Sequence, residues 1–180
     1  MIIAGVDEVG RGCLAGPVIA SAVILNENKI NGIKDSKKIS SKKRLNLSDQ
    51  IKLNSDYSFG VVSPSVIDKI NIHNASLLAM KKAIENLDIK PDIIYVDGLY
   101  VPETAFKTKA IVKGDSLIKE ISAASILAKV YRDNLMIEYD KKYPGYFLKE
   151  NKGYPTIAHK QALQLLGPSI IHRRSFKGVL

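Results

Sequence analysis

The apolar segment Ile2–Val6 is followed at once by two acids, Asp7 and Glu8. Such a segment predicts a buried or half-buried strand. A carboxylate beside a buried sheet is costly unless a cation balances it, and adjacent carboxylates repel each other. Acids are also common in solvated turns. The pair therefore indicates either a turn after an edge strand or a site that holds a cation.

The sequence Gly10-Arg11-Gly12 comes directly after these acids. Its glycines allow close approach of a bulky group, and the planar guanidinium of Arg11 suits phosphate. The same residues also fit the dinucleotide-binding pattern G-x-G-x-x-G/A. We reject that interpretation because Gly16-Pro17 falls where the phosphate-binding helix would run, and Val18–Leu25 predicts a second strand. Carboxylates beside a phosphate-binding loop are compatible if divalent cations lie between them.

The composition is typical of one soluble globular domain that spans residues 1–180. The sequence shows no apolar run long enough to cross a bilayer and no signal peptide, and its single cysteine, Cys13, fits a reducing compartment. We therefore expect a cytoplasmic protein in which Cys13 is a packing residue.

The net charge of +9 predicts a polyanionic partner. Basic residues gather in four segments, 34–38, 41–44, 149–152 and 172–174. A charged cluster alone is usually only a solvated surface. Basic rims together with an acidic site are what a nuclease needs, because the rims bind the nucleic-acid backbone and the acids bind metal.

The pattern of apolar residues predicts an α/β fold with a mixed sheet. The expected strands are Ile2–Val6, Val18–Leu25, Tyr57–Val61, Ile93–Val96 and Ala110–Val112. The expected helices begin at Ser40 or Ser41, at Ser63-Pro64, near Asn74, near Leu117 and at Thr156. The helix from about Leu117 to Tyr139 is apolar on several faces, so we expect it to lie at the centre of the fold.

Two further acids, Asp97 and Asp115, follow the fourth and fifth expected strands. Ligands gather beyond the carboxyl ends of strands in open α/β sheets, so these acids can meet Asp7 and Glu8 in one cleft. Taken singly, Asp97-Gly98 is compatible with a plain turn, and Asp115 is better explained as a helix N-cap. Taken together, the four carboxylates favour two divalent cations about 3.5–4 Å apart. Hard oxygen ligands select Mg²⁺ or Mn²⁺ over zinc.

A set of short motifs, in order along nearly the whole chain, resembles the bacterial type 2 ribonuclease H family (ribonuclease HII). The motifs are Gly5-Val6-Asp7-Glu8-Val9-Gly10-Arg11-Gly12, Asp35-Ser36-Lys37-Lys38, Asn71-Ile72, Val96-Asp97-Gly98, Lys113-Gly114-Asp115-Ser116, Ala123-Ala124-Ser125-Ile126-Leu127-Ala128-Lys129-Val130, Lys152-Gly153-Tyr154-Pro155-Thr156 and Gly167-Pro168-Ser169. Each motif alone is weak, but the ordered set is specific.

The resemblance implies the ribonuclease H fold, a five-stranded mixed sheet flanked by helices. It also implies that residues from about 141 onward form a short C-terminal helical substrate-binding extension. The implied activity is hydrolysis of RNA in RNA–DNA hybrids and incision 5′ to ribonucleotides embedded in duplex DNA, leaving 3′-hydroxyl and 5′-phosphate ends. We expect the enzyme to act as a monomer.

In the family the acids that match Asp7, Glu8, Asp97 and Asp115 form the catalytic metal site, with Mg²⁺ or Mn²⁺ and two ions when substrate is bound. These residues are therefore the expected catalytic and metal-binding residues of this chain.

The resemblance also assigns substrate recognition. Gly10, Arg11 and Gly12 are implied to read the ribose 2′-OH, largely through the backbone, and Tyr154 to pack on the sugar at the RNA–DNA junction. Without the resemblance, Tyr154 is better explained as a packed turn residue. Lys37, Lys38 and Lys129 are predicted phosphate contacts.

The sequence departs from the family pattern in three respects, and two alternative interpretations compete with this one. Cys13 stands where many relatives have proline, Asn151 stands where histidine is frequent, and the sequence shows no clamp-binding extension. One rival is a non-catalytic nucleic-acid-binding module on the same fold. The other is a type 3 relative, which the Gly-Arg-Gly loop and Tyr154 disfavour.

Overall fold

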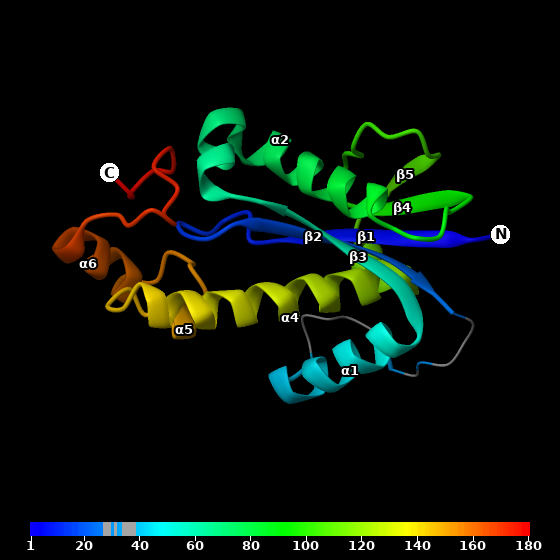
Figure 1. The fold of residues 1–180 in the computed structure, drawn as a ribbon, viewed down its shortest axis with the longest axis horizontal. Helices are drawn as coiled ribbons and strands as arrows, with labels where there is room; N and C mark the ends of the chain where they lie inside the picture. Colours follow the sequence, from blue (N-terminus) through cyan, green and yellow to red (C-terminus); the bar gives the residue numbers. More distant parts are fainter. Residues whose placement is uncertain (27–29, 31, 34–38) are drawn as a thin grey trace.

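The computed structural model describes residues 1–26, 30, 32–33 and 39–180. A five-stranded sheet forms its centre, in the order β3-β2-β1-β4-β5 (Figure 1). The strands are β1 (Ile3–Val9), β2 (Val18–Leu25), β3 (Ser55–Val62), β4 (Ile93–Asp97) and β5 (Thr108–Ile111). The pairs β3-β2 and β2-β1 are antiparallel, whereas β1-β4 and β4-β5 are parallel. The predicted mixed sheet is confirmed.

The helices are α1 (Ser41–Leu53), α2 (Pro64–Glu85), α3 (Gly114–Leu117), α4 (Lys119–Lys142), α5 (Leu148–Asn151) and α6 (Ile157–Leu166). Two of them begin at predicted side-chain caps. The Ser40 hydroxyl accepts from the Lys43 N–H, and the Thr156 hydroxyl accepts from the His159 N–H. Within the part of the chain that the structure describes, no helix is long and apolar enough to span a membrane.

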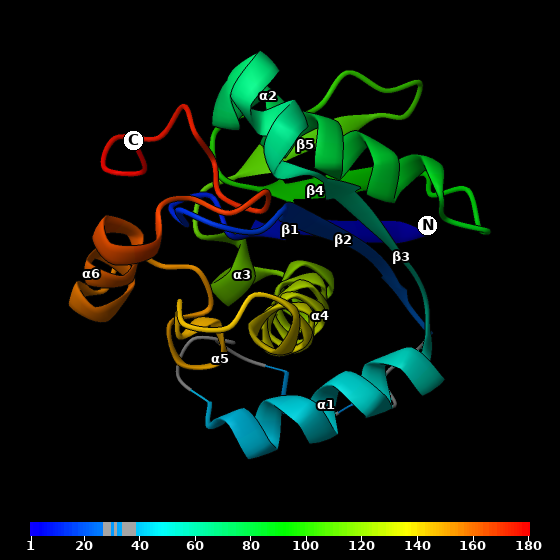
Figure 2. The same ribbon diagram turned by 60° about the vertical axis from the view of Figure 1, so that its left-hand side comes forward.

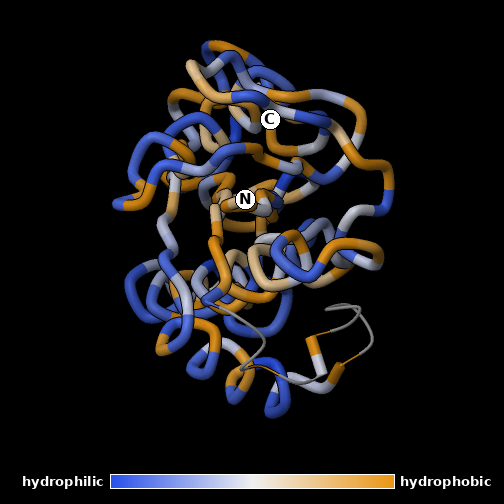
Figure 3. Tube along the Cα trace, turned by 90° about the vertical axis from the view of Figure 1, so that its right-hand side faces the viewer, coloured by the Kyte–Doolittle hydropathy of each residue, from blue (hydrophilic) through white to orange (hydrophobic). Residues whose placement is uncertain are grey.

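The two long helices cover opposite faces of the sheet (Figures 1 and 2). Helix α2 packs against β1, β2 and β3 over one apolar core. Helix α4 packs on the other face against β1 and β2, and α1 lies outside it over a second core. Seen from the N-terminal end, the chain near the N-terminus is largely hydrophobic, and many of the outer turns are hydrophilic (Figure 3).

The close approach of α4 to the sheet depends on Gly5 in β1. A Cβ at Gly5 would collide with the backbone of Glu120 and Ile121 at the start of α4. The segment 121–128 of α4 is buried throughout, which confirms its predicted central position. Helix α4 therefore lies directly beneath the strand that carries Asp7 and Glu8.

The C-terminal segment has its own small core. Leu148, Leu163 and Ile171 pack there with Leu14 from the loop after β1 and with Met136 from α4. Figure 2 shows α5 and α6 beside the end of the sheet, away from the N-terminus. The loop after β1 is therefore enclosed between α4 and residues that follow it by more than a hundred positions.

Two local expectations, for β1 and for Asp115, were wrong, and one, for the helices around Asn71, was confirmed. Strand β1 continues through the acids to Val9, because residues 5–9 pair with β2. The two helices predicted from Ser63-Pro64 and from near Asn74 are confirmed as the two parts of α2, which meet at the non-helical residue Asn71, where φ is 65°. Asp115 is not an N-cap but lies in the first turn of α3, whose N-cap position is Lys113.

Candidate active site

The sheet register places Asp7 and Asp97 next to each other. Val6 on β1 is the parallel partner of Val96 on β4, so the residue that follows each of them is an aspartate. Gly5 contacts α4, and side chains alternate along a strand, so Asp7 faces α4 as well. There its carboxylate accepts a hydrogen bond from the Ser125 side chain. Two acids ninety residues apart in sequence thus share one edge of the sheet.

A cleft of about 460 Å³ opens at this edge. The predicted site residues that line it are Asp7, Glu8, Gly10, Arg11, Gly12, Asp97 and Tyr154. Arg44 from α1 and Ser125 and Lys129 from α4 also line it. The cleft therefore combines carboxylates, a glycine-containing loop, cationic side chains and an aromatic ring.

The Asp7 carboxylate is almost fully buried, with 6% of its surface exposed. Burial raises the pKa of Asp7 well above its ordinary value, and the charges of Glu8 and Asp97 raise it further. The hydrogen bonds from Ser125 and from the Glu8 backbone N–H, at 2.8 Å from Oδ1, oppose this shift. The ionised form of Asp7 is thus disfavoured in the protein alone.

Glu8 is partly compensated by its neighbour Arg11. Burial raises the pKa of Glu8, the positive charge of Arg11 lowers it, and Asp97 raises it again. The Arg11 Nη1 lies 3.5 Å from Glu8 Oε1, and the Arg11 side chain is 45% exposed. Arg11 can therefore turn from Glu8 toward a phosphate, because an exposed ion pair of this length is weak.

Asp115 lies next to the cleft without lining it, as far as the described residues show. It is buried in the first turn of α3. The preceding residue, Gly114, donates its backbone N–H to Asp97 Oδ1 at 2.7 Å. Asp115 is thus tied to Asp97 through α3, and the structure brings together three of the four predicted acids with the fourth adjacent.

The donor set of the cleft fits hard divalent cations. Among the residues that the structure describes, no three His, Cys, Asp or Glu side chains are already arranged as a metal-binding cluster. The carboxylates nevertheless face one another closely enough for Glu8 and Asp97 to raise the pKa of Asp7. A buried group of like charges is relieved by a cation, and oxygen ligands without histidine or cysteine suit Mg²⁺ or Mn²⁺.

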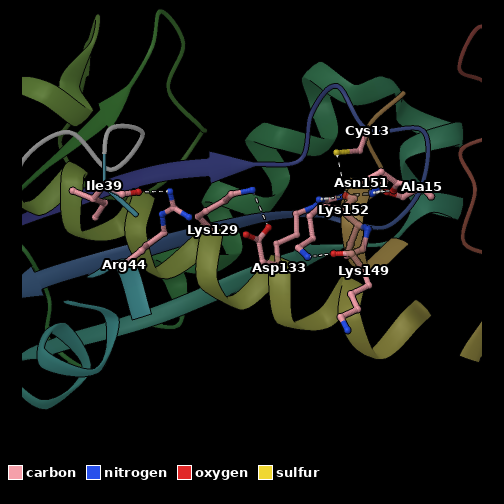
Figure 4. A network of polar contacts seen from close by, with 12 residues as sticks. Cys13, Ala15, Ile39, Arg44, Lys129, Asp133, Lys149, Asn151 and Lys152 are labelled. Carbon is pink, nitrogen blue, oxygen red and sulfur yellow. Dashed lines mark hydrogen bonds and ion pairs between the residues drawn. The ribbon is translucent and has the colours of Figure 1, made fainter. Parts of the chain in front are cut away.

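Tyr154 lines the same cleft as the acids and is 37% exposed. The Lys129 Nζ is 5.8 Å from the centre of its ring, and the Arg132 guanidinium is 5.9 Å from it. Lys129 also pairs with Asp133 at 2.8 Å, as Figure 4 shows. Arg44, in the same view, donates to the Ile39 carbonyl. The Tyr154 ring thus lies near two cationic side chains of α4 and borders the cleft.

Two fully buried arginines hold the backbone of the loop after β1. Arg132 of α4 donates to the carbonyls of Ala15, Pro17 and Lys152 at 2.7–3.0 Å. Arg173 donates to the carbonyls of Gly10, Arg11 and Gly16 at 2.6–2.9 Å. We call this arrangement, Arg132 and Arg173 with their carbonyl partners, the arginine clamp.

The prediction that segment 172–174 is part of a basic rim was wrong, because Arg173 belongs to the buried arginine clamp. His172 and Arg173 are buried, and only Arg174 of the three is exposed. Burial lowers the pKa of Arg173 to about 10, so the guanidinium is charged at neutral pH but faces carbonyls instead of solvent. Sequence reasoning missed this role because a basic triplet looks the same whether it is exposed or buried.

Gly10 is required by the clamp as well as by the cleft. Its φ is 91°, which favours glycine, and a Cβ there would collide with the Arg132 guanidinium. A Cβ at Gly12, in contrast, would meet open space. The predicted reason for the glycines, room for an approaching ligand, therefore applies to Gly12, and Gly10 makes room for Arg132.

The other predicted site residues are placed as follows. Cys13 is buried, with Sγ 3.7 Å from the Lys152 carbonyl, which confirms its packing role. Lys129 lines the cleft, whereas Lys37 and Lys38 lie outside the described residues. Ser125 was missed because a serine in an apolar helix segment carries no signal beyond its position one helical turn from Lys129.

Solved structures with a similar fold include ribonucleases of the H class. The crystal structure of ribonuclease H2 from Pyrococcus horikoshii OT3 is 30% identical and superposes with a TM-score of 0.85, over 99% of this chain and 95% of that one. Bst-RNase HIII, crystallised in complex with Mn²⁺, is 16% identical with a TM-score of 0.78, over 99% of this chain and 68% of that one. The fold is therefore that of ribonuclease H.

The sequence comparisons narrow this class to one family. The family model described as Ribonuclease HII matches residues 4–179. Ribonuclease HII of Borrelia hermsii (strain HS1 / DAH) is 57% identical over 179 residues, covering 98% of this chain and 99% of the relative. The chain belongs to the ribonuclease HII family and is a ribonuclease H endonuclease. This membership decides against both rivals, the non-catalytic binding module and the type 3 relative.

Proposed function

We propose that the protein hydrolyses the RNA strand of RNA–DNA hybrids and incises 5′ to ribonucleotides embedded in duplex DNA, in a reaction that depends on divalent metal. The products are 3′-hydroxyl and 5′-phosphate ends. The observation that carries this proposal is the cleft in which Asp7, Glu8 and Asp97 face the Gly10-Arg11-Gly12 loop and Tyr154. Carboxylates that would only repel a phosphate backbone are useful there if metal lies between them.

The metal ligands in this proposal are Asp7, Glu8 and Asp97, with Asp115 as the fourth. Mg²⁺ or Mn²⁺, as two ions with substrate bound, would supply an activated water and stabilise the leaving oxygen. Support comes from the oxygen-only donor set and from the raised pKa of Asp7, which a cation would lower again. A neighbour of the same fold, Bst-RNase HIII, was crystallised with Mn²⁺.

Substrate recognition in the proposal rests on the loop and on Tyr154. The backbone around Gly12 is open to the cleft, so it can contact a 2′-OH, the group that distinguishes RNA from DNA. The half-exposed ring of Tyr154 packs on the sugar at the RNA–DNA junction. Arg44 and Lys129 contact phosphates along the cleft, and the segment from about residue 141 forms the substrate-binding extension.

The setting of the reaction is part of the same proposal. The protein acts as a monomer in the cytoplasm, and its substrates are RNA–DNA hybrids and duplex DNA that contains ribonucleotides. The net charge of +9 supports a nucleic-acid partner, and the unpaired, buried thiol of Cys13 fits a reducing compartment.

Removal and return of metal test the proposed function. We expect EDTA to stop cleavage of an RNA–DNA hybrid and Mg²⁺ or Mn²⁺ to restore it. Binding of the hybrid should survive in part in EDTA, because phosphate contacts to basic residues do not need metal. Full cleavage in EDTA, or restoration by zinc alone, would contradict the proposal.

A further inference from the structure

His159 and His172 form a buried pair behind Tyr154. Both imidazoles are almost completely buried, at 0% and 2% exposure, and their Nε2 atoms lie 3.1 Å apart. His159 belongs to α6, and His172 belongs to the segment after it, which Figure 2 shows next to α6. Neither side chain lines the cleft. A buried pair of this kind needs a structural or functional reason.

The backbone partners at the two ends determine which nitrogen carries each proton. His159 Nδ1 lies 2.9 Å from the Tyr154 carbonyl, which can only accept, so this nitrogen donates. His172 Nδ1 lies 3.0 Å from the Ser169 backbone N and 2.8 Å from the Ser169 hydroxyl. The backbone N–H can only donate and the hydroxyl can also donate, so this nitrogen accepts. In the neutral rings, His172 Nε2–H therefore donates to His159 Nε2. The result is a series of hydrogen bonds that all point the same way, from Ser169 through the two rings to the carbonyl of Tyr154.

A proton added to either ring would break this series of hydrogen bonds. On His159 Nε2 it would face the N–H of His172, and on His172 Nδ1 it would face the Ser169 N–H. Burial lowers the pKa of both rings, that of His172 to about 4 with a contribution from His159. The other titratable groups around the pair are Tyr146, whose ring is 4.7 Å from that of His172, Tyr154 and Arg173. Among the described residues, no carboxylate contributes to the pKa of either ring.

The same series of hydrogen bonds is connected to the loop after β1, which in the proposed function reads the substrate. His172 pairs with Ala15 in an isolated bridge, and the Leu14 N–H donates to the Gly153 carbonyl beside Tyr154. The pair therefore lies where the Tyr154 turn, α6 and the loop after β1 meet. A change in the pair can reach Tyr154 directly through its carbonyl.

We infer that His159 and His172 are positioning residues that fix the peptide group of Tyr154, and with it the ring, for recognition of the RNA–DNA junction. This inference rests on the proposed function, because it needs Tyr154 to contact substrate. The Tyr154 carbonyl accepts two hydrogen bonds, one from His159 and one from the Thr156 N–H. Loss of the first leaves the peptide group held on one side only.

Two substitutions of His159 separate positioning from stability. Asn places its amide N–H near the position of His159 Nδ1, so His159→Asn keeps the donor to Tyr154 and loses the contact to His172. Gln places its oxygen near the position of Nε2, so His159→Gln keeps the contact to His172 and loses the donor to Tyr154. The same position thus provides its own matched control.

The experiment compares kcat and KM on two duplexes, one with a single ribonucleotide and one with an all-RNA strand on DNA. We expect His159→Gln to lower the preference for the single ribonucleotide about threefold to tenfold, the scale of one hydrogen bond, and His159→Asn to keep it within about twofold. Thermal unfolding of each variant monitors the fold. Equal changes in the two variants, or none in either, would overturn the inference.

Tyr154→Ala, measured in parallel, separates the inference from the proposed function. If Tyr154→Ala lowers the preference and the two His159 variants do not differ, only the positioning inference fails. If Tyr154→Ala leaves the preference unchanged, the proposed role of Tyr154 fails and the inference with it.

A measurement on the wild-type protein covers the case in which a variant does not fold. The chain has three histidines, His73, His159 and His172, so ¹⁵N NMR of the imidazoles resolves each one. We expect a proton on Nδ1 of His159 and on Nε2 of His172, with His73 on α2 as the internal reference. The same tautomer in both buried rings would overturn the inference.

Discussion

Asp7 occupies a position that folding alone does not favour. Its carboxylate is buried, and Glu8 and Asp97 add like charge beside it. A pKa raised in the folded state means that the folded chain holds the proton more tightly than the unfolded chain. The ionised residue therefore lowers stability as the pH rises through that raised pKa. Such a cost at a site residue is consistent with a group that is placed for a ligand.

Asp7→Asn is predicted to abolish turnover and to stabilise the metal-free protein. Asn retains an oxygen for the Ser125 and Glu8 hydrogen bonds but carries no charge. Each kcal/mol gained would raise Tm by about 2–4 °C for a chain of this size. Asp49→Asn on the exposed side of α1 is the matched control. Calorimetry in EDTA measures the shift, and a lower Tm for Asp7→Asn would count against the electrostatic account.

At the scale of elements, the loop after β1 is held mainly by the arginine clamp. Arg173 donates to three carbonyls and Arg132 to three more, and two of the three hydrogen bonds of each arginine are buried. A buried acceptor that loses its donor costs about 1–3 kcal/mol. The clamp thus holds Gly10 and Arg11 in the shape that borders the cleft.

Arg173→Lys is predicted to lower the free energy of unfolding by at least about 2 kcal/mol, because one ammonium group cannot reach all three carbonyls. This loss corresponds to a fall in Tm of about 4–8 °C. Arg174→Lys is the control, since that side chain is exposed and should change stability by less than about 0.5 kcal/mol. Similar effects of the two substitutions in thermal unfolding would show that the clamp does not hold the loop.

Sequence patterns were sufficient for most of the elements. Apolar runs located the five strands, and the Ser40 and Thr156 caps fixed two helix starts. The meeting of Asp7 and Asp97 followed from the rule that ligands gather beyond the carboxyl ends of strands, although β1 continues two residues past Asp7. The clamp and the histidine pair could not be predicted, because they join residues separated by as many as 163 positions and depend on burial. The break at Asn71 was predicted, because separate helix starts at Ser63-Pro64 and near Asn74 imply an interruption between them.

At the scale of the whole molecule, a buried histidine of the C-terminal segment makes the stability of the protein depend on pH. The pKa of His172 is about 4 in the folded chain, below its ordinary value of 6.5. Between these values the unfolded chain binds a proton that the folded chain does not bind, so stability falls as the pH falls from 6.5 to 4. The largest slope for one such group is about 1.4 kcal/mol per pH unit.

His172→Asn is predicted to reduce this slope in denaturant unfolding measured between pH 7 and pH 5. Asp7 and Glu8 act in the opposite direction, since their raised pKa values make the folded chain take up protons first. The informative quantity is therefore the difference in slope between wild type and variant. Identical slopes would show that folding does not lower the pKa of His172.

Cleavage mapping on a DNA duplex with one embedded ribonucleotide tests most directly whether the acidic cleft is a metal-dependent ribonuclease site. With Mg²⁺ or Mn²⁺ we predict one incision, on the 5′ side of the ribonucleotide, with 3′-hydroxyl and 5′-phosphate ends. The incision should disappear in EDTA and in Asp7→Asn, while Asp49→Asn retains it. Incision that persists in Asp7→Asn, or that maps to deoxyribonucleotides, would contradict the account.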